Sequence, residues 1–269
     1  MKKFSTLIVM ILTVSILSLS CADKKDGYEL ALITDVGNID DRSFNQGAWE
    51  GLKKYAEEKG ITHKYYQPTE KTTDAYVDSI DLSIAAGAKL VVTPGFLFEP
   101  AIYRAQDNHP KINFVLLDGS PQDGNYKDFR IEKNVYSIFY AEEQAGFLAG
   151  YGVVKEGYTN LGVMAGMAVP AVVRFGYGFV QGADYAAKEF GVRNVKVDYN
   201  YIGGFNPSPE TQTKAASWYR NGVQVIFSPA GGAGNSVMSA AEQNNGYVVG
   251  VDVDQSEESP TVITSAMKM

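Results

Sequence analysis

The stretch T-D-V-G-N-I-D-D-R-S-F-N-Q-G-A-W, Thr34–Trp49, decides the fold of this chain. It follows the apolar run Tyr28–Ile33, which is typical of a buried strand, and it ends in the start of a helix. Between strand and helix lies a loop with the carboxylates Asp35, Asp40 and Asp41. In open α/β sheets, ligands bind at loops that follow the carboxyl ends of strands. The stretch therefore predicts one wall of a ligand site.

The helix at the end of this stretch has a recognisable start. The residues Ser43–Gln46 fit S-x-x-Q, a capping box, so Ser43 is predicted as the N-cap and Phe44 as the first helical residue. Apolar side chains then recur at helical spacing as far as Lys59 and predict a face packed on the core. Phe44 stands at the very start of this face. Spacing alone leaves open whether its ring enters the core or a cleft.

Strand-like and helix-like segments alternate along the rest of the chain, which predicts an α/β fold with parallel sheets covered on both faces. The other strand-like runs are Lys89–Thr93, Ile112–Leu117, Val135–Phe139, Leu161–Ala165, Val195–Ile202, Val223–Phe227, Tyr247–Val253 and Thr261–Thr264. The helix-like segments are Phe44–Lys59, Asp74–Ala86, Pro100–Asn108, Glu142–Val154, Val172–Phe190, Pro209–Arg220 and Asn235–Asn244. The order of strand, glycine-containing loop and helix recurs on either side of Phe139. Two similar lobes are expected, with the first crossing between them near Tyr136–Ala141.

Composition and the first residues indicate an exported globular protein. The length of 269 residues allows one large or two medium domains, and the net charge of -7 argues against nucleic-acid binding. Residues 1–20 combine two lysines with an apolar run too short to span a membrane, as in a secretory signal peptide. Cys21, the only cysteine, follows directly and is the expected lipidation site. The match is imperfect because Ser18 stands where leucine is usual, so a plain signal peptide with an incidental cysteine is the alternative. Residues 21–27 are expected to form a polar tether from the lipid to the domain.

The sequence offers little for catalysis. His63 and His109 are the only histidines and are predicted at the surface, away from the ligand loops, and no cysteine or histidine cluster has metal-ligand spacing. Neither a metal nor a cofactor is expected. The glycine-rich segment Ala230–Gly234 is open to two interpretations, an anion-binding loop or a tight turn into a helix. The carboxylates of several strand-end loops would repel a phosphate but accept hydrogen bonds from a neutral ligand rich in N–H and O–H groups.

Several segments together resemble the basic membrane protein family of substrate-binding lipoproteins, which includes the purine nucleoside receptors of ABC importers. The segments that carry this resemblance are Thr34–Leu52, G-F-L-F at Gly95–Phe98, F-V-L-L-D-G at Phe114–Gly119, E-E-Q-A-G-F-L-A-G-Y at Glu142–Tyr151, G-G-F-N-P at Gly203–Pro207, A-G-G-A-G at Ala230–Gly234, G-V-D-V-D-Q at Gly250–Gln255 and T-S-A-M-K at Thr264–Lys268. The resemblance implies a type I periplasmic-binding-protein fold with two doubly wound lobes, a hinge and a cleft that closes on the ligand. Residues 28–138 would form the N-terminal lobe, residues 139–260 the C-terminal lobe, and residues 261–269 would return to the first.

The resemblance also implies residue roles. Phe44 and Phe205 would stack on a purine. Asp35, Asn45 and Asp118 would hydrogen-bond the base, and Gly231, Asp252 and Lys268 would hold the ribose hydroxyls. The implied protein is a monomer without enzymatic activity, anchored to the cell membrane by its lipid and facing the periplasm or the exterior. It would deliver adenosine, inosine or guanosine to an ABC permease.

One departure and three alternatives accompany the resemblance. Members of the family continue beyond the T-S-A-M-K segment, whereas this sequence stops at Met269, so a C-terminal part is expected to be missing. A receptor for a sugar or another small metabolite on the same fold is the first alternative. The second is an exported nucleoside hydrolase, with Asp35, Asp40 and Asp41 as its metal ligands. The third is a surface protein that binds a host molecule.

Overall fold

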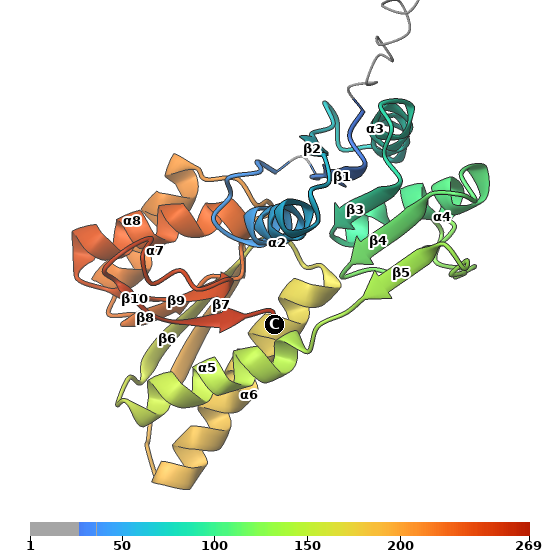
Figure 1. Ribbon diagram of the computed structural model, residues 1–269. Coiled ribbons are helices and arrows are strands. Elements are labelled where there is room, and N and C mark those ends of the chain that lie inside the picture. Colours follow the sequence, from blue (N-terminus) through green and yellow to red (C-terminus); the bar gives the residue numbers. More distant parts are fainter. Residues whose placement is uncertain (1–26, 36) are drawn as a thin grey trace, which may run out of the picture.

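Two parallel sheets of five strands organise the molecule (Figure 1). The computed structural model describes residues 27–35 and 37–269. The predicted signal peptide, Cys21 and all of the predicted tether except its last residue lie outside the described residues. Every strand pair within the two sheets is parallel, so the strand ends that carry loops toward the helices gather on one edge of each sheet.

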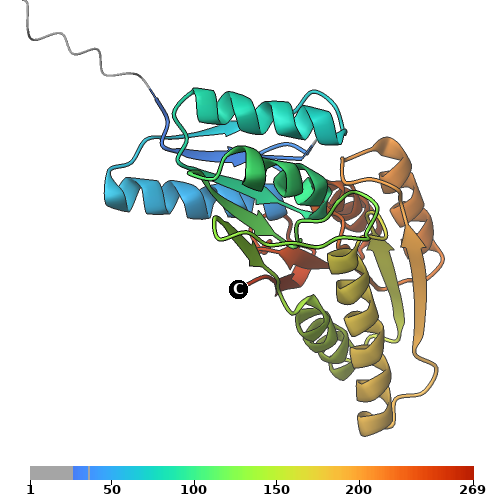
Figure 2. The ribbon, with the colours of Figure 1, turned by 90° about the vertical axis from the view of Figure 1, so that its right-hand side faces the viewer.

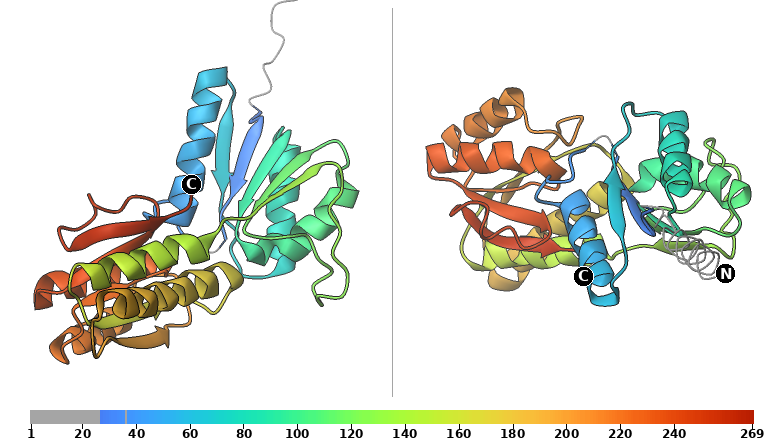
Figure 3. Two further views of the ribbon diagram at one scale, coloured as in Figure 1. Left: turned by 90° about the horizontal axis from the view of Figure 1, so that it is seen from below. Right: turned by 45° about the horizontal axis from the view of Figure 1, so that its top comes forward.

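The first sheet has the order β2-β1-β3-β4-β5. Its strands are β1 (Leu30–Ile33), β2 (His63–Tyr66), β3 (Leu90–Pro94), β4 (Asn113–Leu117) and β5 (Val135–Ile138). Helix α2 (Phe44–Lys59) packs on one face, while α3 (Thr73–Ala85) and α4 (Glu99–Asn108) pack on the other (Figure 3). A single 3₁₀ turn, η2 (Phe96–Phe98), precedes α4. Alternate residues of β1 face the two layers, which is why all four are buried and apolar.

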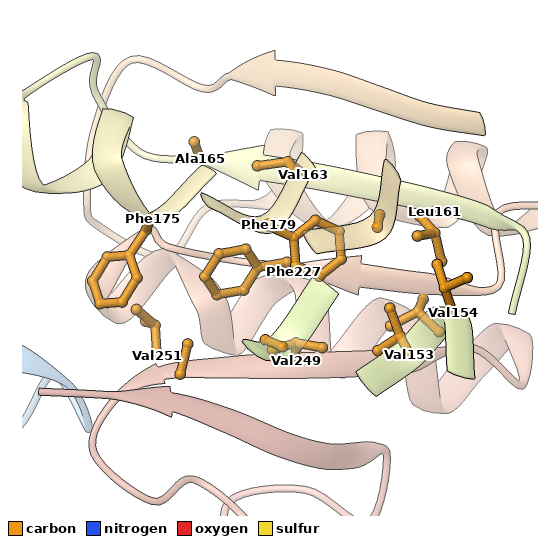
Figure 4. Packing of buried hydrophobic residues seen from close by; sticks show 14 of the residues in the cluster. Val153, Val154, Leu161, Val163, Ala165, Phe175, Phe179, Phe227, Val249 and Val251 are labelled. Atoms are coloured by element: carbon orange, nitrogen blue, oxygen red, sulfur yellow. The ribbon is translucent and has the colours of Figure 1, made fainter. Parts of the chain in front are cut away.

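The second sheet has the order β10-β9-β8-β6-β7. Its strands are β6 (Asn160–Ala165), β7 (Lys196–Tyr201), β8 (Val225–Phe227), β9 (Tyr247–Asp252) and β10 (Val262–Met267). Helices α5 (Glu142–Lys155) and α6 (Pro170–Phe190) cover one face around a core that includes Phe175, Phe179 and Phe227 (Figure 4). Helices α7 (Pro209–Arg220) and α8 (Gly234–Asn244) cover the other, with the 3₁₀ turn η3 (Gly231–Ala233) before α8.

Helices α5 and α6 lie side by side with unusually little space between their backbones (Figure 2). A Cβ added to Gly150 would lie 2.0 Å from the carbonyl oxygen of Phe179, and one added to Gly182 would lie 2.0 Å from that of Phe147. Only glycine permits such an approach, because a methyl group would overlap a backbone oxygen. This contact fixes α6 relative to the chain that enters α5 from the first lobe.

Two sequence expectations need correction in the folded chain. Residues 261–269 were expected to return to the first lobe, but β10 pairs with β9 in the second sheet and buries Ala266 in that lobe's core. Strand β2 was not expected, because an edge strand that exposes much of its surface carries no apolar run. The helix-like segments all form helices with ends within two residues of those predicted.

Candidate functional site

A cavity lies between the two lobes, where the carboxyl ends of the strands of both sheets meet. The structure brings all eight predicted ligand residues to its walls: Asp35, Phe44, Asn45 and Asp118 from the first lobe, and Phe205, Gly231, Asp252 and Lys268 from the second. Phe44 is only half-buried and lines this cavity. Helical spacing left open whether the Phe44 ring enters the core or a cleft, and the structure places it in the cleft.

The helix behind Phe44 is capped differently from the prediction. Ser43 is the N-cap residue, but its hydroxyl makes no capping hydrogen bond. The carboxylate of Asp41 takes that role and accepts from the backbone N–H groups of Ser43, Asn45 and Gln46 at 2.9–3.1 Å. Ser43 Oγ instead donates to Asp252 Oδ2 at 2.5 Å in the other lobe. The expected reciprocal capping box is therefore wrong, because the serine hydroxyl has an ionic partner across the cleft.

Asp41 is held in an environment that opposes its charge. Burial raises the pKa of Asp41 to about 6, against the three backbone N–H groups that lower it, and the nearby charge of Asp252 raises it further. The loop before it is fixed by Asp35, whose Oδ1 accepts from the N–H of Gly37 at 2.7 Å and from Asn45 Nδ2 at 3.2 Å. Asn45 Oδ1 is buried and accepts no hydrogen bond from any described residue. This amide oxygen is available to a donor on a ligand.

Lys268 joins the two lobes. Its Nζ forms an ion pair with Asp118 of the first lobe and lies 3.2 Å from Asp252 Oδ1 of the second. Its side chain is only 8% exposed, and its ammonium lies 3.7 Å from the centre of the Phe44 ring, a cation–π contact. Burial alone would lower the pKa of Lys268, but the carboxylates of Asp252 and Asp118 outweigh it and raise the pKa. Lys268 is therefore a permanent cation in the cavity wall.

The two carboxylates on either side of Lys268 have equivalent positions in the two lobes. Asp118 follows β4 and Asp252 ends β9, and both adopt the left-handed conformation, with φ of 57° and 67°. This conformation is uncommon for residues with a Cβ but is tolerated by aspartate. Burial raises the pKa of Asp118 to about 7, although Lys268 lowers it. The turn of the chain at both positions directs a carboxylate toward the cleft.

Aromatic and apolar groups form the remaining walls. Phe205 packs against the C-terminal lobe, where its ring lies so close to Gly166 that a Cβ there would be 2.3 Å from it. Gly231 has a φ of 54° and also lies against the Phe205 ring. Phe175 and Val172 of α6 extend the apolar surface. The cavity thus combines aromatic rings from both lobes with a row of charged groups at the strand ends.

Sequence reasoning missed several groups around this cavity. Glu142 and Tyr140 lie beside Lys268 on the side of the hinge, and Arg174 pairs with Glu142. Gln255 Nε2 donates to the carbonyl oxygen of Arg42 at 2.6 Å, and Arg42 pairs with Glu258 at 2.6 Å, so both contacts bridge the lobes. Glu142 stood in a quoted segment, but a glutamate at a helix start is common and gave no separate signal.

The described residues provide no group of three or more side chains that could hold a metal ion. Asp35 and Asp41 are instead committed to backbone and amide donors. Neither histidine lines the cavity, and His109 pairs with Asp81 at 2.7 Å. Within the described part of the chain, no helix is both long enough and apolar enough to cross a membrane.

Comparisons with known proteins identify the family of this chain. A family model described as "ABC transporter substrate-binding protein PnrA-like" (Bmp) matches residues 28–269. A similar protein is the ABC transporter nucleoside-binding protein BmpA of Lactococcus lactis subsp. cremoris, 34% identical over 86% of this chain. Basic membrane protein A2 of Borrelia garinii subsp. bavariensis is 31% identical over 97% of this chain. The matched regions are 65% and 76% of these relatives, so the chain spans about two thirds to three quarters of their length.

Solved structures that align with this chain identify its fold. A solute-binding protein of an ABC transporter system from Aeropyrum pernix K1 aligns with a TM-score of 0.75 and 26% identity, over 88% of this chain and 66% of that one. A periplasmic binding protein/LacI transcriptional regulator from Alkaliphilus metalliredigens aligns with a TM-score of 0.59 at 17% identity, over 87% of this chain and 83% of that one. The second likeness concerns the fold alone. The expected type I periplasmic-binding-protein fold is confirmed.

Proposed function

Because the chain belongs to the Bmp family, the PnrA-like substrate-binding proteins of ABC transporters, we propose that it binds a purine nucleoside between its lobes and delivers it to a permease. The family consists of substrate-binding proteins of transporters rather than enzymes, in agreement with the expectation of a binding protein. We further propose that Cys21 carries a lipid that holds the protein at the membrane. The cavity chemistry supports the choice of ligand, and one relative's name includes nucleoside binding.

The observation that carries the proposal is that Phe44, Phe205 and the Asp252–Lys268 ion pair line one cavity. Phe44 and Phe205 come from different lobes and line the same space, so closure of the lobes would enclose a flat ring between them. Offset aromatic stacking contributes about 0.5–1.5 kcal/mol beyond the buried area. A purine base has the flat surface that such a pair of rings accommodates.

The charged end of the cavity suits a ribose. Asp252 accepts hydrogen bonds through two oxygens, and Lys268 beside it is a donor. Vicinal hydroxyls can donate to the first and accept from the second. Asp35, Asp41 and Asp118 also line the cavity, so a phosphate would meet several carboxylates and one lysine. A nucleoside without phosphate is therefore the preferred form of the ligand.

Isothermal titration calorimetry with the complete chain tests the proposal. Inosine, guanosine and adenosine are expected to bind, whereas ribose alone and the nucleoside monophosphates are expected to bind weakly or not at all. The Phe44→Ala variant should lose at least about tenfold in affinity for the bound nucleoside, which corresponds to about 1.4 kcal/mol. Phe147→Ala is the matched control, because Phe147 packs on Tyr185 outside the cavity and its loss should leave affinity unchanged.

Two results would contradict the proposal. Binding of ribose or another sugar with no binding of any nucleoside would favour the alternative of a sugar receptor. Equal affinity of wild type and Phe44→Ala for a nucleoside would exclude stacking on Phe44. The lipid anchor is tested separately: Cys21→Ala expressed in a bacterial host should move the protein from the membrane fraction to the soluble fraction, and an unchanged distribution would exclude the anchor.

A further inference from the structure

A buried glutamate outside the predicted ligand set contacts the cation of the site. Glu142 is the first residue of α5, directly after the connection that crosses from β5 of the first lobe. Its side chain is fully buried, and its Oε1 lies 4.0 Å from Lys268 Nζ. Its Oε2 accepts from Arg174 Nε of α6 at 2.6 Å. Glu142 therefore links the hinge, helix α6 and the lysine.

The position of Glu142 is fixed by close backbone packing between α5 and α6. Gly178, one turn after Arg174, lies so close to α5 that an added Cβ would be 2.1 Å from the carbonyl oxygen of Glu143. Gly146, one turn after Glu142, lies equally close to Phe175. Neither helix can slide along the other without a backbone collision, so the Arg174–Glu142 pair has a fixed location beneath Lys268.

The charged side chains around Lys268 carry a net negative charge when all of them are ionised. Three carboxylates, Asp118, Asp252 and Glu142, face the cations Lys268 and Arg174. Two carboxylate oxygens, Asp118 Oδ1 and Glu142 Oε1, are buried without a donor from the described residues. A carboxylate has only acceptors, so one proton shared by the two would satisfy both and leave the group neutral. The raised pKa of Asp118, about 7, and the lowered pKa of Glu142 place that proton on Asp118, consistent with this geometry.

We propose that Glu142 is a positioning residue of the ligand site: held by Arg174, it keeps the Lys268 ammonium between Asp118 and Asp252, where it contacts the ligand. The inference rests on the proposed function for its ligand but depends on contacts within the chain for its mechanism. Glu142 itself does not line the cavity, so it acts through Lys268 and Asp118. Without it, Lys268 would be drawn toward Asp118 and away from Asp252.

Glu142→Gln tests the proposal in the complete chain. The glutamine oxygen still accepts from Arg174, whereas its NH₂ group becomes a permanent donor to Asp118. Nucleoside affinity should fall by about tenfold, as expected for the loss of one charge-assisted contact. Glu143→Gln is the matched control: it removes the same charge from the next residue, whose side chain is 47% exposed and 3.9 Å from Arg174. That variant should bind within twofold of wild type.

The titration of Asp118 separates positioning from a general structural effect and needs no ligand. The charged and titratable groups that face it are Glu142, Lys268, Asp252, Tyr140 and, through Glu142, Arg174. Carboxyl ¹³C NMR of the ligand-free protein should show Asp118 titrating near pH 7 in wild type and in Glu143→Gln. In Glu142→Gln, the midpoint should move at least one pH unit lower, because the ionised form of Asp118 gains a donor and loses a negative neighbour.

The outcomes are distinguishable. If wild type binds no nucleoside, the proposed function fails, and the NMR titration still decides whether Glu142 controls the Asp118–Lys268 pair. An unchanged Asp118 midpoint in Glu142→Gln would overturn the inference. A double-mutant cycle supplies the last readout: Glu142→Gln should have little further effect on affinity in a Lys268→Met background. Additive losses in the two variants would also overturn it.

Discussion

The close contact of α5 and α6 predicts that two alanine substitutions on the same helix have opposite effects on the free energy of unfolding. Gly150 and Gly152 both lie in α5, two residues apart. A Cβ at Gly150 would lie 2.0 Å from the carbonyl oxygen of Phe179 and 2.8 Å from its carbonyl carbon, whereas a Cβ at Gly152 has no other atom within 4 Å. Gly150→Ala therefore places a methyl group against the backbone of α6, whereas Gly152→Ala places the same group in open space.

The expected magnitudes follow from these distances. Relief of the overlap at Gly150 requires α6 to move by about 1 Å, since real Cβ atoms stay beyond about 3 Å from such an oxygen. Overpacking typically costs about 1–3 kcal/mol, and a backbone obstacle that has no flexible end belongs at or above the top of that range. Gly152→Ala should instead stabilise the lobe by up to about 1 kcal/mol, because alanine is the better helix former. The two variants should thus differ by about 4 kcal/mol.

Urea unfolding monitored by tryptophan fluorescence measures this difference. The chain has two tryptophans. Trp49 packs in the first lobe and Trp218 in the second. A Trp49→Phe background makes the signal specific to the second lobe. In that background, the midpoint of Gly150→Ala should fall below that of the parent and the midpoint of Gly152→Ala should rise slightly above it. Equal midpoints for the two alanine variants would refute the packing described for α5 and α6.

Three further predictions concern the cavity and its charges. Phe205→Ala should weaken nucleoside binding by about tenfold in calorimetry, because the second stacking ring is lost; unchanged affinity would exclude that role. Asp252→Asn should weaken binding of a ribonucleoside by about tenfold and that of its 2′,3′-dideoxy analogue much less, because the carboxylate is expected to accept from the two hydroxyls. The contribution of Asp41 and Asp118 to thermal stability should fall as pH rises from about 4 to about 7, because their pKa values are raised to about 6 and about 7. Their folded forms hold protons that the unfolded chain has released, so this stability is present in acid and lost on titration. Asp118→Asn should flatten the fall between pH 6 and 7, and an unchanged slope would contradict the assignment.

The sequence was sufficient to place most elements and the strand ends that form the cavity. Buried parallel strands such as β1 and β8 are continuous apolar runs, and the amphipathic helices between them have clear periods. Because parallel strands end on a common edge, residues as distant as Asp35 and Asp118 could be assigned to the same edge of the sheet. The family resemblance then supplied the pairing of Phe44 with Phe205, which periodicity could not.

What the sequence did not reveal depends on contacts between distant segments. The role of Asp41 as the helix cap required knowing that the Ser43 hydroxyl is engaged by Asp252, 209 residues away. The location of β10 beside β9 could not be inferred, since an apolar run indicates a strand but not its neighbour. Glu142 had no signal of its own, because its significance comes from Arg174 and Lys268 rather than from local spacing.

The equivalence of the two lobes explains why one lysine can contact an aspartate of each lobe. Asp118 and Asp252 occupy the same place in the two sheets, after the fourth strand along the chain in each lobe, and both have the same unusual backbone conformation. Two such carboxylates facing each other across a cleft would repel and favour an open form. Lys268 is contributed by only one lobe, yet its ammonium contacts the aspartates of both. Its positive charge offsets their repulsion and links the two lobes. A neutral ligand with hydroxyl groups can enter this bridge without changing its net charge, whereas a phosphate would compete with both aspartates for the same cation.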